Sequence, residues 1–192
     1  MRDVDIRRTL RSDERLHAGD PDTRIVEELG LCQGLARVDL AVVNGTIHGY
    51  EIKSENDTLL RLPSQVAIYS RVLDCVTVVT ASTHVGNVQR IVPDWWGIWV
   101  ATGHSGACAF QEFRRGTVNP GVDPFALVQL LWRDEALQVL VAHGLAGGMR
   151  SKSRRALWTR LSAELTPDEL GCRVRDCLKN RAKSWRVGVR QV

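Results

Sequence analysis

Hydrophobic and polar residues alternate over short runs in the first part of the chain and recur at helical spacing in the last part. Two apolar runs joined by Asn44 and Gly45 predict a β-hairpin, because Asn-Gly is a strong turn signal. Residues 75–81 are rich in β-branched side chains, which is typical of a buried strand, and residues 97–102 are expected to form another. Helices are expected over residues 3–16, 21–30 and 84–92, and from Pro63 onward. This order of helices and strands predicts an α/β fold built in layers.

A change of pattern at residues 119–124 marks a boundary. The segment contains two prolines and a glycine, and Asp123 followed by Pro124 is typical of a helix start. Beyond it, apolar residues recur with the period of a helix, and a capping box opens a last helix. We therefore expect residues 1–119 to form the α/β core and residues 120–192 to form an all-helical basic extension.

Positive charge is concentrated in this extension. Residues 150–192 contain 12 Lys and Arg against 4 acids, so the first 149 residues carry a net charge of −4 although the whole chain carries +4. A basic segment suits a polyanionic partner, because phosphate contacts supply most of the non-specific affinity for nucleic acid. Two solvated helix faces would give the same pattern, since a charge run alone is weak evidence. Nucleic acid is the expected partner, with DNA favoured over RNA.

Other features narrow the class of protein. The N-terminal residues are charged where a signal peptide needs an apolar stretch, and no apolar run approaches the length that spans a membrane. The chain is therefore expected in the cytoplasm, without membrane contact. Its 5 cysteines are scattered without Cys-x-x-Cys spacing, so neither a disulfide framework nor a zinc ribbon is expected.

The predicted hairpin carries two acids and a lysine. A two-residue loop would pair Asp39 with Tyr50 and leave Glu51 on the opposite face of the hairpin. A three-residue loop over residues 44–46, or a bulge, instead pairs Asp39 with Glu51 and places Lys53 on the same face. Two carboxylates and a lysine on one face can hold Mg²⁺ and activate a water for phosphodiester hydrolysis, so nuclease chemistry requires this second register.

The second register also assigns the remaining hairpin residues to faces. Ala41 and Gly49 share the face of the acids, where their small size would leave room beside a metal. The opposite face would pack against the core through its apolar side chains, which are Val38, Leu40, Val42, Tyr50 and Ile52.

The same residues resemble the motifs of a known superfamily. Asp39, Glu51-Ile52-Lys53 and the segment from Gln65 to Tyr69 resemble the PD-(D/E)XK nucleases, and the Gln-x-x-x-Tyr helix is similar to that of the RecB-like and lambda-exonuclease-like branch. The stretch from Gly34 to Trp99 also resembles a family of uncharacterised bacterial proteins assigned to that superfamily. The resemblance implies a restriction-endonuclease-like core, which is a mixed sheet flanked by helices.

The chain departs from the superfamily in two respects. Val38 stands where the motif has its first proline. Some relatives hold an iron–sulfur cluster through four cysteines, but the cysteines here do not match that arrangement, so no cluster is expected.

The resemblance implies a metal site. Asp39, Glu51 and the backbone carbonyl of Ile52 would bind Mg²⁺ or Mn²⁺, and an acid from the preceding helix would complete the site. Glu27 and Glu28 are the candidates for that acid. Only one of two neighbouring residues on a helix can point inward, and the family pattern favours Glu28.

The resemblance also implies roles for three other side chains. Lys53 would orient or deprotonate the attacking water and offset charge in the transition state. Gln65 would orient the lysine or the water. Tyr69, one helical turn later, would support Gln65 or contact the phosphate backbone.

These expectations lead to three interpretations. The first is a Mg²⁺-dependent nuclease that hydrolyses DNA, in repair, recombination or defence. The second is a nuclease-like fold without catalysis that serves as a nucleic-acid-binding or regulatory module. The third makes Glu51 and Lys53 ordinary paired charges on an exposed strand. Each is compatible with a protein partner or a homodimer.

Overall fold

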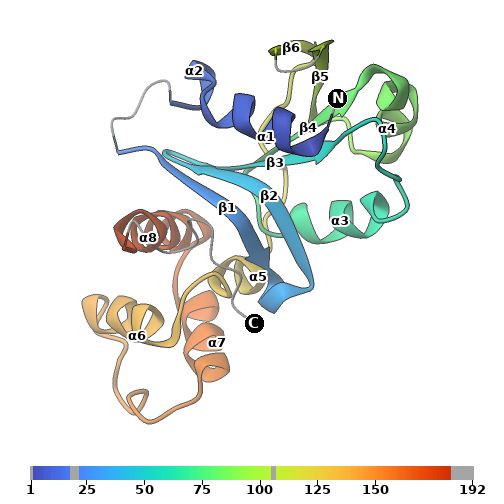
Figure 1. Cartoon of the computed structure of the whole chain (residues 1–192). Helices are drawn as coiled ribbons and strands as arrows, with labels where there is room; N and C mark the ends of the chain where they lie inside the picture. Colours follow the sequence, from blue (N-terminus) through green and yellow to red (C-terminus); the bar gives the residue numbers. More distant parts are fainter. Residues whose placement is uncertain (1, 18–21, 105–106, 183–192) are drawn as a thin grey trace.

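A computed structural model of the chain describes residues 2–17, 22–104 and 107–182 (Figure 1). The described strands form one sheet whose spatial order follows the chain. They are β1 (Arg24–Leu31), β2 (Ala36–Val43), β3 (Ile47–Lys53), β4 (Cys75–Ala81), β5 (Gly97–His104) and β6 (Ala107–Arg114). β3, β4 and β5 are mutually parallel, whereas the pairs β1–β2, β2–β3 and β5–β6 are antiparallel.

Helices cover both faces of this sheet. They are α1 (Asp3–Arg11), α2 (Glu14–His17), α3 (Leu62–Tyr69), α4 (Val85–Ile91), α5 (Pro124–Val128), α6 (Arg133–Ala142), α7 (Arg154–Glu164) and α8 (Pro167–Asn180). On one face, Ile6 and Leu10 of α1 pack with Leu40 and Tyr50 of the hairpin. On the other face, α3, α4 and the later helices join a larger cluster. The prediction of an α/β fold with a mixed sheet flanked by helices and followed by C-terminal helices is confirmed.

The C-terminal helices share their hydrophobic cluster with the sheet. Leu127 of α5, Trp158 of α7 and Leu170 of α8 belong to the same cluster as Val26 of β1 and Val43 of β2. α8 contacts β2 and lies on the side of the sheet where β1 and β2 are found (Figure 1). Removal of these helices would therefore expose part of the core. Within the described ranges, no helix is long and apolar enough to cross a membrane.

The helix expected over residues 21–30 is wrong. Arg24–Leu31 forms β1, which pairs antiparallel with β2 along its length. Val26 and Leu29 are 2% exposed in this arrangement. Pairing with a neighbouring strand therefore outweighs the local preference on which the prediction rested.

Other boundaries also differ from the expectation. The helix expected over residues 3–16 is divided into α1 and α2, and the apolar stripe after Pro124 is divided between α5 and α6. The sequence analysis did not include β6, which pairs with β5 at one edge of the sheet.

The hairpin has the wider turn that nuclease chemistry requires. Val43 pairs with Ile47, so residues 44–46 form the loop. Asn44 closes this loop: its N–H donates to the carbonyl of Thr46 at 3.0 Å, and its Oδ1 accepts from the N–H of Thr46 at 3.1 Å. The register of the three-residue loop is therefore confirmed from Val43–Ile47 to Leu40–Tyr50, whereas the expected pair of Asp39 with Glu51 lies beyond the end of the ladder.

The room expected beside Gly49 is already filled. A Cβ atom at Gly49 would lie 2.5 Å from Leu73 Cδ1 and 3.1 Å from Val38 Cγ2. Val38 thus packs in the large cluster on the face of Gly49 and not, as expected, on the opposite face with Leu40. This change of face lies next to the end of the β2–β3 ladder, whose last pair is Leu40 with Tyr50.

Candidate active site

Glu51 and Lys53 lie inside the molecule at the C-terminal end of β3. Their exposed fractions are 2% and 4%, and Lys53 Nζ donates to Glu51 Oε1 at 2.6 Å. Residues two apart on a strand share a face, so both side chains can meet the same helix. Burial of the pair argues against the interpretation in which the two charges lie on an exposed strand.

Gln65 of α3 joins the two charged groups. Its Nε2 donates to Glu51 Oε1 at 2.6 Å, and its Oε1 accepts from Lys53 Nζ at 3.1 Å. α3 begins at Leu62, which is fully buried and fixes the start of the helix against the core. The amide therefore holds both the acid and the ammonium group in one position.

Tyr69 completes the polar surroundings of Glu51. Its hydroxyl lies 2.6 Å from Glu51 Oε2 and 2.7 Å from the carbonyl oxygen of Arg37. Its ring stacks on Trp96 with a centroid distance of 5.9 Å. Burial and the neighbouring Glu51 raise the pKa of Tyr69, so the hydroxyl stays protonated and acts as a donor.

Asp39 lies where β2 and β3 separate. Beyond the last paired residues, the N–H of Ile52 donates to Asp39 Oδ2 at 2.8 Å, so the carboxylate serves as an acceptor between the two strands. Burial and then the negative charge of Glu51 raise the pKa of Asp39 to about 7, although the Ile52 N–H and Arg7 act in the opposite direction. The two acids therefore repel one another within the site.

The other oxygen of Asp39 is held by Arg7 of α1. Arg7 Nη2 donates to Asp39 Oδ1 at 2.9 Å, while Nη1 donates to the Asp39 carbonyl at 3.0 Å and to Glu28 Oε1 at 3.1 Å. Arg7 is a site residue that was not predicted from the sequence. The available signal was its four-residue spacing from Arg11 on the first helix, which puts two cations on one side of that helix.

Glu28, the acid expected from a preceding helix, lies instead on β1. Its φ of 53° falls in the left-handed region and interrupts the regular alternation of the strand. Its side chain is 46% exposed and contacts Arg37 at 3.7 Å in addition to Arg7. Glu27 contacts Arg11 at 2.7 Å. Each of the two acids therefore faces an arginine of α1.

Asp39 and Glu51 are the two acids that a divalent cation could share here. In the part of the chain that the structure describes, no three His, Cys, Asp or Glu side chains gather in a metal-binding arrangement. Mg²⁺, however, usually keeps several waters and is bound through one or two carboxylates. Repulsion between the buried Glu51 and the half-buried Asp39 is the condition that a bound cation relieves, so this pair could hold a hard divalent ion.

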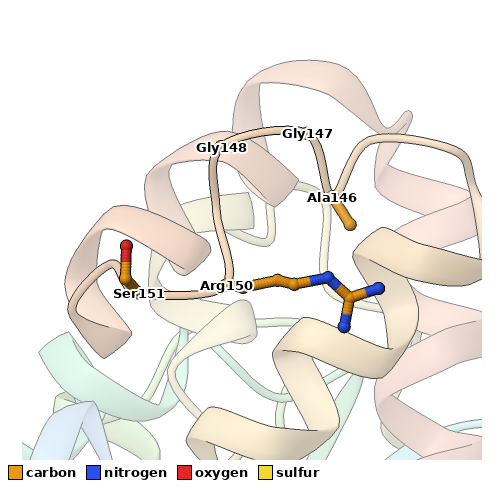
Figure 2. A pocket seen from close by; sticks show the side chains of 5 residues that line it. All are labelled: Ala146, Gly147, Gly148, Arg150 and Ser151. Atoms are coloured by element: carbon orange, nitrogen blue, oxygen red, sulfur yellow. The ribbon is translucent and has the colours of Figure 1, made fainter.

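The basic extension has a separate pocket. The connection between α6 and α7 lines a surface pocket of about 440 Å³ through Ala146, Gly147, Gly148, Arg150 and Ser151. Figure 2 shows the Arg150 side chain passing beneath the glycine-rich loop, while Ser151 points elsewhere. The pocket therefore adds a cation to the basic extension and no group to the acid–lysine site.

Comparison with known proteins identifies the family. The model of the family described as bacteriophage P4 protein cII matches residues 12–187. The chain belongs to this protein cII family. Protein cII of Enterobacteria phage P4 is 26% identical over 160 residues, which cover 83% of this chain and 60% of the phage protein, so this family member spans about three fifths of that relative.

One solved structure is distantly similar to this chain. A protein of unknown function from Silicibacter pomeroyi aligns with a TM-score of 0.43 and 17% identity, over 74% of this chain and 92% of that protein.

Proposed function

We propose that this protein cII family member is a metal-dependent nuclease of the PD-(D/E)XK type that hydrolyses phosphodiester bonds in DNA. The observation that carries the proposal is the buried contact of Glu51 with Lys53, Gln65 and Tyr69, beside Asp39. A buried ion pair contributes little net stability, because desolvation of both charges opposes their attraction. A pair that served only to stabilise the fold would therefore add little stability, so its presence supports a chemical role.

The roles of the residues follow from their contacts. Asp39, Glu51 and the backbone carbonyl of Ile52 would hold Mg²⁺ or Mn²⁺, which supplies positive charge to the phosphate and activates a water. Lys53 would orient or deprotonate this water and offset negative charge that develops on the phosphate. Gln65 keeps the ammonium group of Lys53 in place through its 3.1 Å contact.

The charge of the C-terminal helices supports a nucleic acid as the substrate. Arg150, Lys152, Arg154 and Arg155 are exposed around the start of α7. Exposed cations of this kind attract the phosphate backbone without reading its sequence. Repair, recombination or defence against foreign DNA are settings that would use such an activity.

A nucleic-acid-binding or regulatory module without catalysis is the second candidate. Arg7 favours it, because its guanidinium already satisfies Asp39 Oδ1 and contacts Glu28. In that case the arginine would be a permanent partner of these acids and would take the place of a cation.

Cleavage by the purified protein separates these functions. Labelled single-stranded, duplex and branched DNA and RNA are incubated in Mg²⁺, Mn²⁺ or EDTA with the wild type and with Glu51→Gln. The control is Glu112→Gln, which changes an exposed acid of β6. Divalent-dependent cleavage that is lost only in Glu51→Gln is the expected result.

Two other results would contradict the proposal. Cleavage that persists in Glu51→Gln would show that the activity does not arise at this site. Tight binding of nucleic acid without cleavage by the wild type would favour the binding module.

A further inference from the structure

A second pocket lies beyond the end of β3, the strand that carries Glu51 and Lys53. Its volume is about 340 Å³, and it opens between residues 57–59, which follow β3, and the segment from His84 to the end of α4. β3 and β4 are parallel neighbours in which Lys53 pairs with Thr80, so the chain leaves both strands at the same edge of the sheet. The loop after β3 passes beside α4 in Figure 1. Ligands of α/β sheets commonly bind in the crevice beyond the carboxyl ends of parallel strands.

One wall of this pocket carries His84, Asn87 and Arg90. Nε2 of His84 is buried and has no hydrogen-bond partner among the described residues. Arg90 Nη2 donates to Asn87 Oδ1, which holds the guanidinium at the pocket. A buried polar nitrogen without a partner is unfavourable, so a rotation of the imidazole towards a ligand in the pocket would supply the missing partner and add affinity.

The opposite wall carries one acid and apolar surface. Asp57 Oδ2 accepts from the N–H and the hydroxyl of Ser54 at 2.7 and 2.6 Å, so this acid closes the loop after Lys53. Leu59 on this wall and Ile91 on the other add apolar surface. The pocket therefore combines a cation, an imidazole and an amide on one wall with a carboxylate on the other, and adds two aliphatic side chains. These groups match the phosphate and the less polar sugar or base of a nucleotide.

We infer that this pocket binds one nucleotide of the nucleic-acid strand, with its phosphate on Arg90 and His84 and its sugar or base on Leu59 and Ile91. The assignment of that strand as a substrate rests on the proposed nuclease function, whereas binding in the pocket does not require cleavage. The pocket lining begins at Asp57, in the loop that follows Lys53, so this nucleotide would belong to the same strand as the phosphodiester that would be cut. The pocket volume falls at the lower end of the range for small-molecule sites, about 300 to 1,000 Å³.

The first test is the affinity of a short labelled oligodeoxynucleotide, measured in EDTA and in Ca²⁺. Arg90→Gln is compared with the wild type and with Arg115→Gln, which changes an exposed arginine outside this pocket. We expect Arg90→Gln to weaken binding about tenfold and to lower the salt slope by about 1, because one phosphate contact is lost. Arg115→Gln is expected to bind like the wild type.

The second test examines His84 directly. The ring resonances of His84 are assigned by comparison with His84→Gln and are followed by NMR during titration with the dinucleotide TpT. A diribonucleotide and inorganic phosphate serve as separate arms, because they distinguish DNA, RNA and free anion as the source of the phosphate. We expect TpT to shift the His84 ring more than inorganic phosphate does.

The outcomes for the pocket and for the nuclease function are distinguishable. Unchanged affinity in Arg90→Gln together with an unshifted His84 ring would overturn the pocket, even in a protein that cuts DNA. A wild type that binds neither DNA nor RNA would also overturn it. Weaker binding by Arg90→Gln in a protein that cuts nothing would retain the nucleotide pocket and reject the nuclease function.

Discussion

The two acids of the site are held in different ways. Both oxygens of Glu51 contact donors from β3 and α3, and the side chain is 3% exposed. Asp39 lies where two strands separate, its side chain is 19% exposed, and one of its oxygens depends on Arg7 from α1. The Glu51 half of the site, which comprises Glu51, Lys53, Gln65 and Tyr69, is therefore fixed by the core. The Asp39 half, which comprises Asp39 and Arg7, can change partners through this one arginine. For the proposed nuclease, this difference predicts that catalytic geometry is set at Glu51 and that access is set at Asp39.

Removal of the lysine should have the largest effect on the Glu51 half. Lys53→Met leaves Glu51 buried without its cation, so we expect the free energy of unfolding to fall by about 3 to 5 kcal/mol. Cleavage should fall about 1,000-fold or more, because a group that activates the water and offsets charge is lost. Chemical denaturation and single-turnover cleavage measure the two effects.

A double variant separates stability from chemistry in this experiment. Glu51→Gln combined with Lys53→Met removes both charges, so we expect most of the lost stability to return while cleavage stays absent. Recovery of cleavage in the double variant would show that the pair is structural.

The hydroxyl of Tyr69 should have a smaller effect on the same half. Tyr69→Phe keeps the ring on Trp96 but removes the donor to Glu51 Oε2. We expect the free energy of unfolding to fall by about 1 to 3 kcal/mol, since a buried acceptor loses its partner. Urea denaturation measures this change, and a variant as stable as the wild type would show that Gln65 and Lys53 alone hold Glu51.

Arg7 is the corresponding test of the Asp39 half. Arg7→Met frees Asp39 Oδ1, and we expect the affinity for Mn²⁺ to rise about fivefold, because a partly exposed ion pair contributes about 1 kcal/mol. Arg11→Met is the control, since Arg11 lies on the same helix and contacts Glu27 instead. Titration calorimetry measures both variants. Weaker metal binding in Arg7→Met would mean that the arginine positions Asp39 for the cation.

The pH dependence of Asp39 tests the same carboxylate in the absence of a metal. Folding raises the pKa of Asp39 from 3.8 to about 7, so the fold favours its protonated form. Its contribution to stability is complete below pH 3.8 and is lost as the pH rises through about 7. Asp39→Asn should therefore flatten this part of the stability profile, which denaturation between acidic and neutral pH measures. A carboxyl pKa in the ordinary range by NMR would contradict this sign.

The parts of the site that depend on local geometry could be predicted from the sequence. The length of the turn at residues 44–46 sets the register of the hairpin, and the spacing within a strand places Glu51 and Lys53 on one face. The four-residue spacing of Gln65 and Tyr69 on a helix explains why both reach Glu51.

The remaining features depend on contacts between distant segments. β1 becomes a strand because β2 pairs with it, and β6 depends in the same way on β5. Leu73 fills the space at Gly49, and Arg7 reaches Asp39 across 32 positions of the chain. These contacts join distant segments, so local patterns predicted a helix at Glu28, and the spacing of Arg7 and Arg11 did not identify Asp39 as the partner of Arg7.

The spatial order of the strands also affects how the chain assembles during synthesis. Each strand pairs with the one translated just before it, and the antiparallel pairs of β1, β2 and β3 join segments close in sequence, which favours their rapid formation. The β1–β3 meander can therefore align Asp39 with Glu51 while the ribosome is still translating the later segments. The helices that bury Val26 and Val43 are translated last, so this apolar face stays open to chaperones until α8 has emerged.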